Sequence, residues 1–226
     1  MRPKAVVCVS GGMDSAVTAA LAAQEYEPAF LHASYGQRTA ARERACFERL
    51  ADWLGVGRRL VVEIPALSAI GGSSLTDVNI PVREGAPVLG VVPTSYVPFR
   101  NAHLLSAATS WAEALGARAV FIGAVWEDSS GYPDCRPEFY AAFEQAIRLG
   151  TRPESNISVV TPVIALSKPE IVRRGQALGV PFESTWSCYQ DDEIACGLCE
   201  SCRLRLNAFA AAGASDPLPY RTRGHS

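Results

Sequence analysis

Four of the seven cysteines in this sequence lie close enough together to bind one metal ion. They are Cys188, Cys196, Cys199 and Cys202, in the spacing C-x7-C-x2-C-x2-C. Four thiolates form the closed tetrahedral donor set of a structural zinc site, with no position left open for a substrate. We therefore predict one structural Zn²⁺, with an iron–sulfur cluster or four unligated thiols as the alternatives. A disulfide framework is disfavoured, because the number of cysteines is odd and the chain shows no export signal.

A second chemical signature is the string Ser10-Gly-Gly-Met-Asp-Ser15, which directly follows a short apolar run at 5–9. Glycines allow the backbone to approach a ligand closely, and a helix that begins after them offers unpaired N–H groups and a partial positive charge. Ser10 and Ser15 add hydroxyl donors, and Asp14 has oxygen ligands for Mg²⁺. The string predicts a phosphate site. The alternative is an ordinary strand-to-helix turn in which Asp14 or Ser15 caps the helix.

The hydrophobic pattern around these signatures alternates between the periods of strands and helices. Apolar runs predict strands at 4–10, 28–34, 59–64, 117–125 and 157–162. Helical periods and end signals predict helices at 14–25, 38–54, 104–115, 138–149 and from a capping box at 167–170 to about 179. This alternation predicts an α/β fold with a doubly wound parallel sheet, covered by helices on both faces. In such sheets ligands bind at the carboxyl ends of the strands, where the string at 10–15 lies.

Length and composition place the chain among folded proteins. It has 226 residues, of which 48% are hydrophobic and 19% charged, and these values suit one compact domain with an extension. A net charge of −2 argues against a nucleic-acid partner. No stretch approaches the roughly 18 consecutive apolar residues of a membrane span. Because the apolar run near the N-terminus is also too short for a signal peptide, we expect a cytoplasmic protein without a membrane partner.

The string at 10–15 resembles the pyrophosphate loop of the PP-loop ATPases, SGG-x-DS, and differs from the Walker A and dinucleotide-binding fingerprints. The resemblance implies a fold of the adenine nucleotide alpha hydrolase type. It also implies that ATP is cleaved between its α- and β-phosphates while an oxygen of the substrate becomes adenylated. The expected ATP-binding residues are Cys8, Val9, Ser10, Gly11, Gly12, Met13, Asp14, Ser15, Ala16, Val17 and Thr18. We accordingly expect an ATP-binding domain at 1–180 with a long loop at 65–100, followed at 181–226 by a zinc-binding segment with a C-terminal helix and tail.

Nearly the whole chain is similar to the QueC family of 7-cyano-7-deazaguanine synthases. The matching motifs are SGGMDS at 10–15, YGQR at 35–38, VPFRN at 97–101, YPDCRPEF at 132–139, SKPEIV at 167–172, TWSCY at 185–189 and CGLCESC at 196–202. They follow the order of the family between residues 5 and about 209. One departure is Phe99, where the family commonly has glycine.

The resemblance implies an ATP-dependent carbon–nitrogen ligase of queuosine precursor synthesis. Its small-molecule substrates would be 7-carboxy-7-deazaguanine, ammonia and ATP with Mg²⁺, and its product the nitrile. The reaction would pass through an adenylated acid, an amide and a second activation. The resemblance also implies a homodimer.

The same resemblance assigns site residues. The catalytic residues would be Asp14, Lys168 and Arg136, and the substrate-binding residues Arg100, Asn101, Tyr132, Asp134 and Arg136. Lys168 would neutralise the phosphates as charge develops. Arg100 and Arg136 would pair with the substrate carboxylate or the phosphates. Asp134 would accept hydrogen bonds from the guanine-like edge, and Tyr132 would stack on the ring. The alternative for each is a surface ion pair or loop packing, and for Cys135 we favour packing over a role as nucleophile.

Three other functions stay open on sequence alone. One is a PP-loop enzyme that modifies tRNA, which the absence of a basic appendage disfavours. Another is a QueC-like enzyme that attaches a deazaguanine to a protein, which would keep both the ATP and the zinc motifs. The third is a non-catalytic zinc-binding module, against which the phosphate loop argues.

Overall fold

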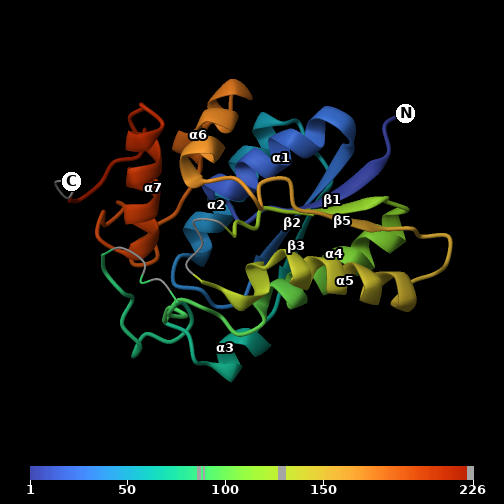
Figure 1. The fold of residues 1–226 in the computed structure, drawn as a ribbon, viewed down its shortest axis with the longest axis horizontal. Coiled ribbons are helices and arrows are strands. Elements are labelled where there is room, and N and C mark those ends of the chain that lie inside the picture. Colours follow the sequence, from blue (N-terminus) through green and yellow to red (C-terminus); the bar gives the residue numbers. More distant parts are fainter. Residues whose placement is uncertain (86–87, 89, 127–130, 223–226) are drawn as a thin grey trace.

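The computed structural model describes residues 1–85, 88, 90–126 and 131–222 and contains one five-stranded parallel sheet (Figure 1). Its strands are β1 (Lys4–Cys8), β2 (Glu27–Ser34), β3 (Arg59–Glu63), β4 (Ala119–Ile122) and β5 (Ser158–Val160). Their order in the sheet is β3-β2-β1-β4-β5, and every neighbouring pair is parallel. The order therefore reverses at β1, and a crevice for a ligand is expected between the carboxyl ends of β1 and β4.

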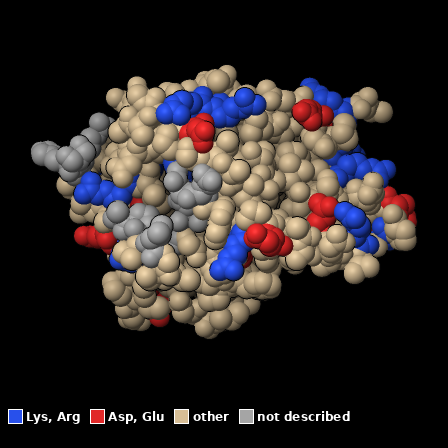
Figure 2. Space-filling view, viewed as in Figure 1, with Lys and Arg blue, Asp and Glu red and all other residues tan. Residues whose placement is uncertain are grey.

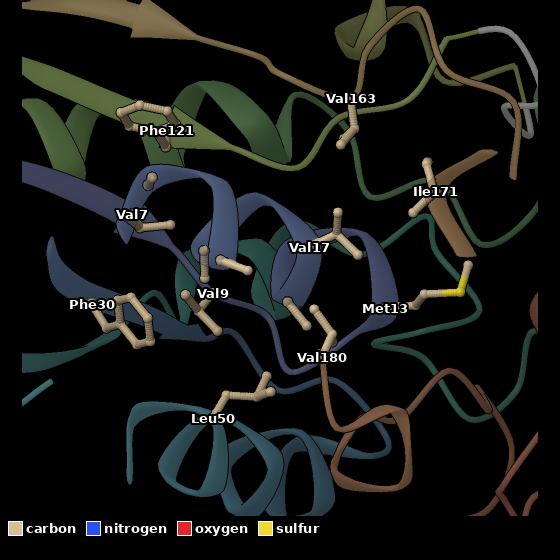
Figure 3. Close-up of a cluster of buried hydrophobic side chains, with 14 of the residues drawn as sticks. Val7, Val9, Met13, Val17, Phe30, Leu50, Phe121, Val163, Ile171 and Val180 are labelled. Atoms are coloured by element: carbon tan, nitrogen blue, oxygen red, sulfur yellow. The ribbon is translucent and has the colours of Figure 1, made fainter. Parts of the chain in front are cut away.

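Helices cover both faces of this sheet. One face carries α1 (Met13–Glu25), α2 (Ala40–Trp53) and α6 (Lys168–Ala177), and the other carries α4 (Arg100–Leu115) and α5 (Pro137–Gly150). Successive side chains of a strand point to opposite faces, so β1 contributes to both layers. Val7 packs in the first layer, in the same cluster as Val17 of α1 and Ile171 of α6 (Figure 3), whereas Val6 and Cys8 pack in the second. The predicted doubly wound parallel sheet is confirmed.

The N-terminus of α6 is capped by residues nearby in the sequence, and that of α4 by a distant residue. The predicted capping box of α6 is present, because the Glu170 carboxylate accepts the Ser167 backbone N–H at 2.8 Å. The helical period predicts a helix at 104–115 and the VPFRN motif at 97–101 predicts its opening, and α4 does begin at Arg100, where Oδ2 of Asp134 accepts the backbone N–H of Asn101 at 2.9 Å. This cap comes from a residue distant in the sequence, so the periodicity of the helix itself does not reveal it.

Phe99, directly before α4, adopts a left-handed conformation with φ 58°. Glycine adopts this conformation without steric cost, which accounts for the glycine that the QueC family commonly has here. The Phe99 ring is exposed and makes an edge contact with Phe139, with the ring centroids 5.9 Å apart. Phe99 thus keeps the left-handed backbone conformation that suits glycine and adds an exposed side chain.

The long segment at 65–100 begins with a short helix, α3 (Ala66–Ile70), and its other described residues before α4 form no further helix or strand. Arg38 holds it in place by donating hydrogen bonds to the carbonyl oxygens of Ser74, Asp77 and Ile80, at 2.7, 3.0 and 2.9 Å. Further along, the loop contacts the cysteine-rich segment, where the Gly85 N–H donates to the Leu198 carbonyl at 3.0 Å.

A buried ion pair attaches the last helix, α7 (Glu200–Ala211), to the body of the protein. The Arg205 guanidinium pairs with Asp216 at 2.7 Å and also donates to Thr185 and to the Phe182 carbonyl. Tyr220 donates to the same Asp216 carboxylate at 2.6 Å. A buried arginine is tolerated because its donors find acceptors. Across the described residues, no helix combines the length and apolarity needed to cross a membrane.

Gly123 provides a test of how tightly the sheet and α1 are packed. A Cβ atom at this position would lie 2.9 Å from backbone atoms of Asp14 and Ser15. We expect Gly123→Ala to lower the free energy of unfolding by about 1–3 kcal/mol, measured by urea denaturation, because backbone atoms cannot yield as a flexible side chain does. Gly57→Ala is the matched control, since its Cβ would meet no atom within 4 Å. Equal stability of both variants would contradict this packing.

Candidate active site

The turn after β1 is shaped by its glycines and two serine hydroxyls. Gly11 has φ +89°, and a Cβ there would lie 2.5 Å from the carbonyl oxygen of Glu43 in α2. Ser10 Oγ accepts the N–H of Gly12 at 3.2 Å and donates to Ser15 Oγ at 3.1 Å. Gly12 is the N-cap of α1, and no side chain caps this helix. The N–H groups of the first turn therefore face the position expected for a phosphate.

Asp14 and Lys168, predicted separately to be catalytic, form an ion pair. Lys168 Nζ lies 2.6 Å from Asp14 Oδ2, although the residues are 154 positions apart in the sequence. Oδ1 of Asp14 is buried and has no hydrogen-bond donor among the described residues. A buried carboxylate oxygen without a partner is costly, and Mg²⁺ prefers such oxygen ligands. Asp14 is therefore suited to hold Mg²⁺ beside a bound triphosphate.

The turn opens into a cavity of about 250 Å³ at the carboxyl end of the sheet. Its wall includes Arg100, Asn101 and Tyr132 in addition to the phosphate loop and Lys168. Arg100 donates a hydrogen bond to the Tyr35 hydroxyl at 3.1 Å. Its Nε is buried without a partner, and no described carboxylate forms an ion pair with it. Arg100 can thus receive an anionic group in the cavity.

Two of the predicted substrate residues lie away from this cavity. Asp134 is buried and caps α4, and its backbone carbonyl accepts the Asn101 side-chain amide at 2.9 Å. The Arg136 side chain is exposed and lies over the Trp126 ring, 6.0 Å from its centroid. Neither residue lines the cavity in the described part of the chain. The structure therefore brings together Asp14, Lys168, Arg100, Asn101 and Tyr132, while substrate contacts of Asp134 and Arg136 stay predictions.

Cys135 also lines the cavity, and its environment suits packing. Burial raises the pKa of the Cys135 thiol to about 11. The thiol is therefore protonated at neutral pH, and a protonated thiol is a weak nucleophile.

The four clustered cysteines are buried, and their sulfur atoms all lie within 4.8 Å of one another. Backbone N–H groups point at two of these sulfurs. Cys188 Sγ receives those of Gln190 and Cys196, and Cys196 Sγ receives those of Leu198 and Cys199, at 3.3–3.4 Å. Such donors stabilise thiolates, which are the metal-binding form of cysteine. The donor set and its compactness fit a tetrahedral metal ion.

Proton sharing within the cluster indicates what a bound cation would change. Hydrogen bonds from Cys199 and Cys202 lower the pKa of the Cys188 thiol. The reciprocal contact with Cys188 raises the pKa of Cys199 to about 12 and raises that of Cys202 as well. Without a cation, further negative charge is therefore disfavoured once Cys188 has lost its proton. A divalent ion compensates that charge and displaces the remaining protons.

The cysteine segment also forms part of the cavity. Trp186, Ser187 and Tyr189 line its wall, and the Trp186 backbone N–H donates to the Gly11 carbonyl at 2.9 Å. Sequence patterns did not single out Glu43, another cavity residue, because it belongs to no recognised motif. Tyr35, which also lines the cavity, belongs to the YGQR motif at 35–38. The motif marks the residue in the sequence but does not indicate what its side chain does.

The comparisons with known proteins agree across almost the full length. The family model of queuosine biosynthesis protein QueC matches residues 4–213. A curated protein from Koribacter versatilis is 58% identical over 98% of this chain and 96% of its own length. One from Chlorobaculum tepidum is 56% identical over 97% of each chain. Both relatives are named 7-cyano-7-deazaguanine synthase.

Solved structures give more distant similarities. An NMN synthetase from Francisella tularensis has a TM-score of 0.47 and 19% identity, over 80% of this chain and 63% of its own. A predicted subunit of a tRNA methyltransferase from Methanocaldococcus jannaschii has a TM-score of 0.45 and 15% identity, over 77% and 74%.

The metal cluster leads to a prediction about stability. We expect Cys199→Ser to lower zinc content, the melting temperature and activity together, because zinc in small sites contributes about 10–16 kcal/mol to folding at neutral pH. Zinc content and Tm are measured on the same sample. Cys46→Ser is the matched control, since Cys46 is buried in the same hydrophobic cluster but is not one of the four clustered ligands. An unchanged Tm after complete zinc removal would overturn the structural role.

Proposed function

This chain belongs to the QueC family of queuosine biosynthesis proteins, and we propose on that basis that it converts 7-carboxy-7-deazaguanine, ammonia and ATP into 7-cyano-7-deazaguanine. The supporting observation is that one cavity contains two separate places for anions. The phosphate loop with Lys168 suits the triphosphate, and Arg100 suits the carboxylate of the acid. Adenylation requires these two anions to meet, and the two places share one cavity.

The residues of the phosphate loop would bind and orient ATP. The N–H groups at the start of α1 and the hydroxyls of Ser10 and Ser15 would surround the phosphates. Lys168, beside Asp14, would neutralise the charge that develops as the bond between the α- and β-phosphates breaks. Mg²⁺ held by Asp14 would supply further neutralisation when bound.

The acid would enter with its carboxylate on Arg100, whose planar guanidinium matches a carboxylate. A carboxylate oxygen attacks the α-phosphorus, pyrophosphate leaves, and an acyl adenylate forms. Ammonia then displaces AMP and leaves an amide. A second ATP adenylates the amide oxygen, and loss of AMP yields the nitrile. Tyr132 and Tyr189 on the cavity wall are placed for contact with a flat bicyclic ring.

We propose that the ion held by the four cysteines is Zn²⁺ and that its role is structural. Four protein thiolates complete its coordination, which leaves no position for water or substrate. Its effect on the reaction would be indirect, since the segment that it orders provides Trp186 and Tyr189 to the cavity.

We also propose a homodimer in the cytoplasm. Exposed apolar side chains at Val91, Val92 and Phe99 form surface that a second copy would cover. All seven cysteines are free, as is usual in a reducing compartment.

The tRNA alternative finds no support in the charge of the protein. The net charge is −2, and basic and acidic side chains lie next to one another on the face shown in Figure 2. A polyanion partner favours a continuous basic surface.

The most direct test is mass spectrometry of the reaction of 7-carboxy-7-deazaguanine, ATP and ammonium with the purified protein. We expect the nitrile together with AMP and pyrophosphate. Consumption of ATP only when a protein acceptor is added would instead favour attachment of the deazaguanine to a protein. An unchanged acid under both conditions would remove the proposal.

A variant of the phosphate loop tests the assignment of ATP to this turn. We expect Asp14→Ala to keep its circular dichroism spectrum and to lose about 100-fold or more in kcat/KM, because Lys168 and Mg²⁺ lose their shared partner. Glu25→Ala at the exposed end of the same helix is the control and should retain activity. Unaltered kcat/KM in a folded Asp14→Ala protein would be incompatible with the assignment.

A further inference from the structure

Glu43 is a carboxylate on the cavity wall that none of the steps above uses. Among the described residues that line the cavity, the acidic ones are Asp14 and Glu43. Asp14 is paired with Lys168, whereas Glu43 forms no ion pair in the described chain. The cavity therefore has cations for its anionic substrates and one carboxylate without an ion-pair partner among the described residues, with the Arg100 guanidinium further away and acting to lower its pKa.

The Glu43 carboxylate is held in place by two neutral donors. Thr39 Oγ1 donates to one oxygen at 2.8 Å, and Gln37 Nε2 donates to the other at 3.0 Å. Gln37 is itself fixed, because its Oε1 accepts the Tyr35 backbone N–H at 2.8 Å. Each carboxylate oxygen has two lone pairs, so both retain the capacity to accept a further hydrogen bond. The Gln37 of the YGQR motif thus orients an acceptor toward a ligand.

Glu43 also lies beside the phosphate loop. Its backbone carbonyl is so close to Gly11 that only a residue without a side chain fits there, which places the first turn of α2 against the phosphate loop. Glu43 lines the same cavity as Ser10, Asp14 and Arg100. A group bound to Glu43 would share this space with the adenylated acid.

Apart from Asp14, which pairs with Lys168, and Cys188, which belongs to the cysteine cluster, the groups on the wall that could take a proton are poor acceptors at neutral pH. Burial raises the pKa of Tyr35 and Tyr189, so their phenols keep their protons. The Cys135 thiol, with a pKa of about 11, is also protonated. Histidine is missing from the described lining. Burial raises the pKa of Glu43 as well, which makes this carboxylate a better proton acceptor than one in water.

We propose that Glu43 binds the nitrogen substrate as ammonium and accepts a proton from it. The inference rests on the proposed function, which consumes ammonia, and it assigns the position of that substrate. Ammonia in water at neutral pH is almost entirely protonated and cannot attack carbon until a proton leaves. A carboxylate without a cationic partner is the favourable place for this cation in a cavity that contains Arg100 and Lys168.

The step is balanced as follows. Ammonium transfers one proton to Glu43, which gives ammonia and a neutral carboxylic acid. The ammonia lone pair forms the C–N bond, and the bond between the acyl carbon and the AMP oxygen breaks with its electron pair on AMP. The nitrogen loses one more proton to water and becomes the amide. Glu43 then releases its own proton to water and is ready for the next ammonium.

Glu43→Gln separates this role from ATP binding. The glutamine amide has the same shape, its oxygen can accept from Gln37, and its NH₂ can donate to Thr39, so the wall of the cavity is kept. We expect acid-dependent exchange of pyrophosphate into ATP close to the wild-type rate, since this half-reaction needs no ammonia. Amide and nitrile formation from ammonium should fall by about 100-fold or more. Hydroxylamine, which is largely neutral at pH 7, should restore C–N bond formation and give the hydroxamate.

The controls separate the possible failures. Glu48→Gln, on the same helix but paired with Arg59 outside the cavity, should use ammonium as the wild type does. If Glu43→Gln is misfolded, Glu43→Asp serves instead, with normal exchange and a raised KM for ammonium. Normal use of ammonium by the folded variant, loss of pyrophosphate exchange, or failure of hydroxylamine would each overturn the role of Glu43. Absence of acid-dependent exchange in the wild type would instead count against the proposed function.

Discussion

The close packing of the turn after β1 is the constraint on which the rest of the site depends. Gly11 contacts the Glu43 carbonyl on one side, Gly123 at the end of β4 contacts the start of α1, and the Trp186 N–H bonds to the turn itself. Three distant parts of the chain thus meet at one turn of the backbone. Because each contact involves backbone atoms, the turn cannot shift without moving α2, β4 and the cysteine segment together.

The charged groups of the cavity each have a partner in the protein that holds them in place. Lys168 and Arg100 both line the cavity wall. Lys168 forms an ion pair with Asp14, and Arg100 donates a hydrogen bond to the Tyr35 hydroxyl. Each cation is therefore held in position before an anion arrives, and no large rearrangement is needed during the reaction. The Glu43 carboxylate accepts hydrogen bonds only from neutral donors, so it gives the cavity a place that favours a cation.

The sheet, its helices and the cysteine cluster could be predicted because their signals are local. Each of these signals lies within a short stretch of sequence. They are the strand and helix periods, the Ser167 capping box and the cysteine spacing. The cap of α4 could not be predicted, because it comes from Asp134, which is distant in the sequence. For the same reason, no pattern within 65–100 predicts the conformation of this loop. Arg38, which precedes the loop in the sequence, holds it in place. Asp134 had a recognisable motif, but only the structure shows that it caps α4.

The order of the cavity residues along the chain has a consequence during protein synthesis. The phosphate loop leaves the ribosome early, whereas Lys168, Trp186 and the buried Arg205 are among the later parts to emerge. The loop therefore stands without its lysine partner and without one wall of the cavity until α6, the cysteine segment and α7 have folded onto the sheet. Under the proposed function, a chain truncated before α6 would carry the phosphate loop without Lys168 and without one wall of the cavity, and would not activate a substrate.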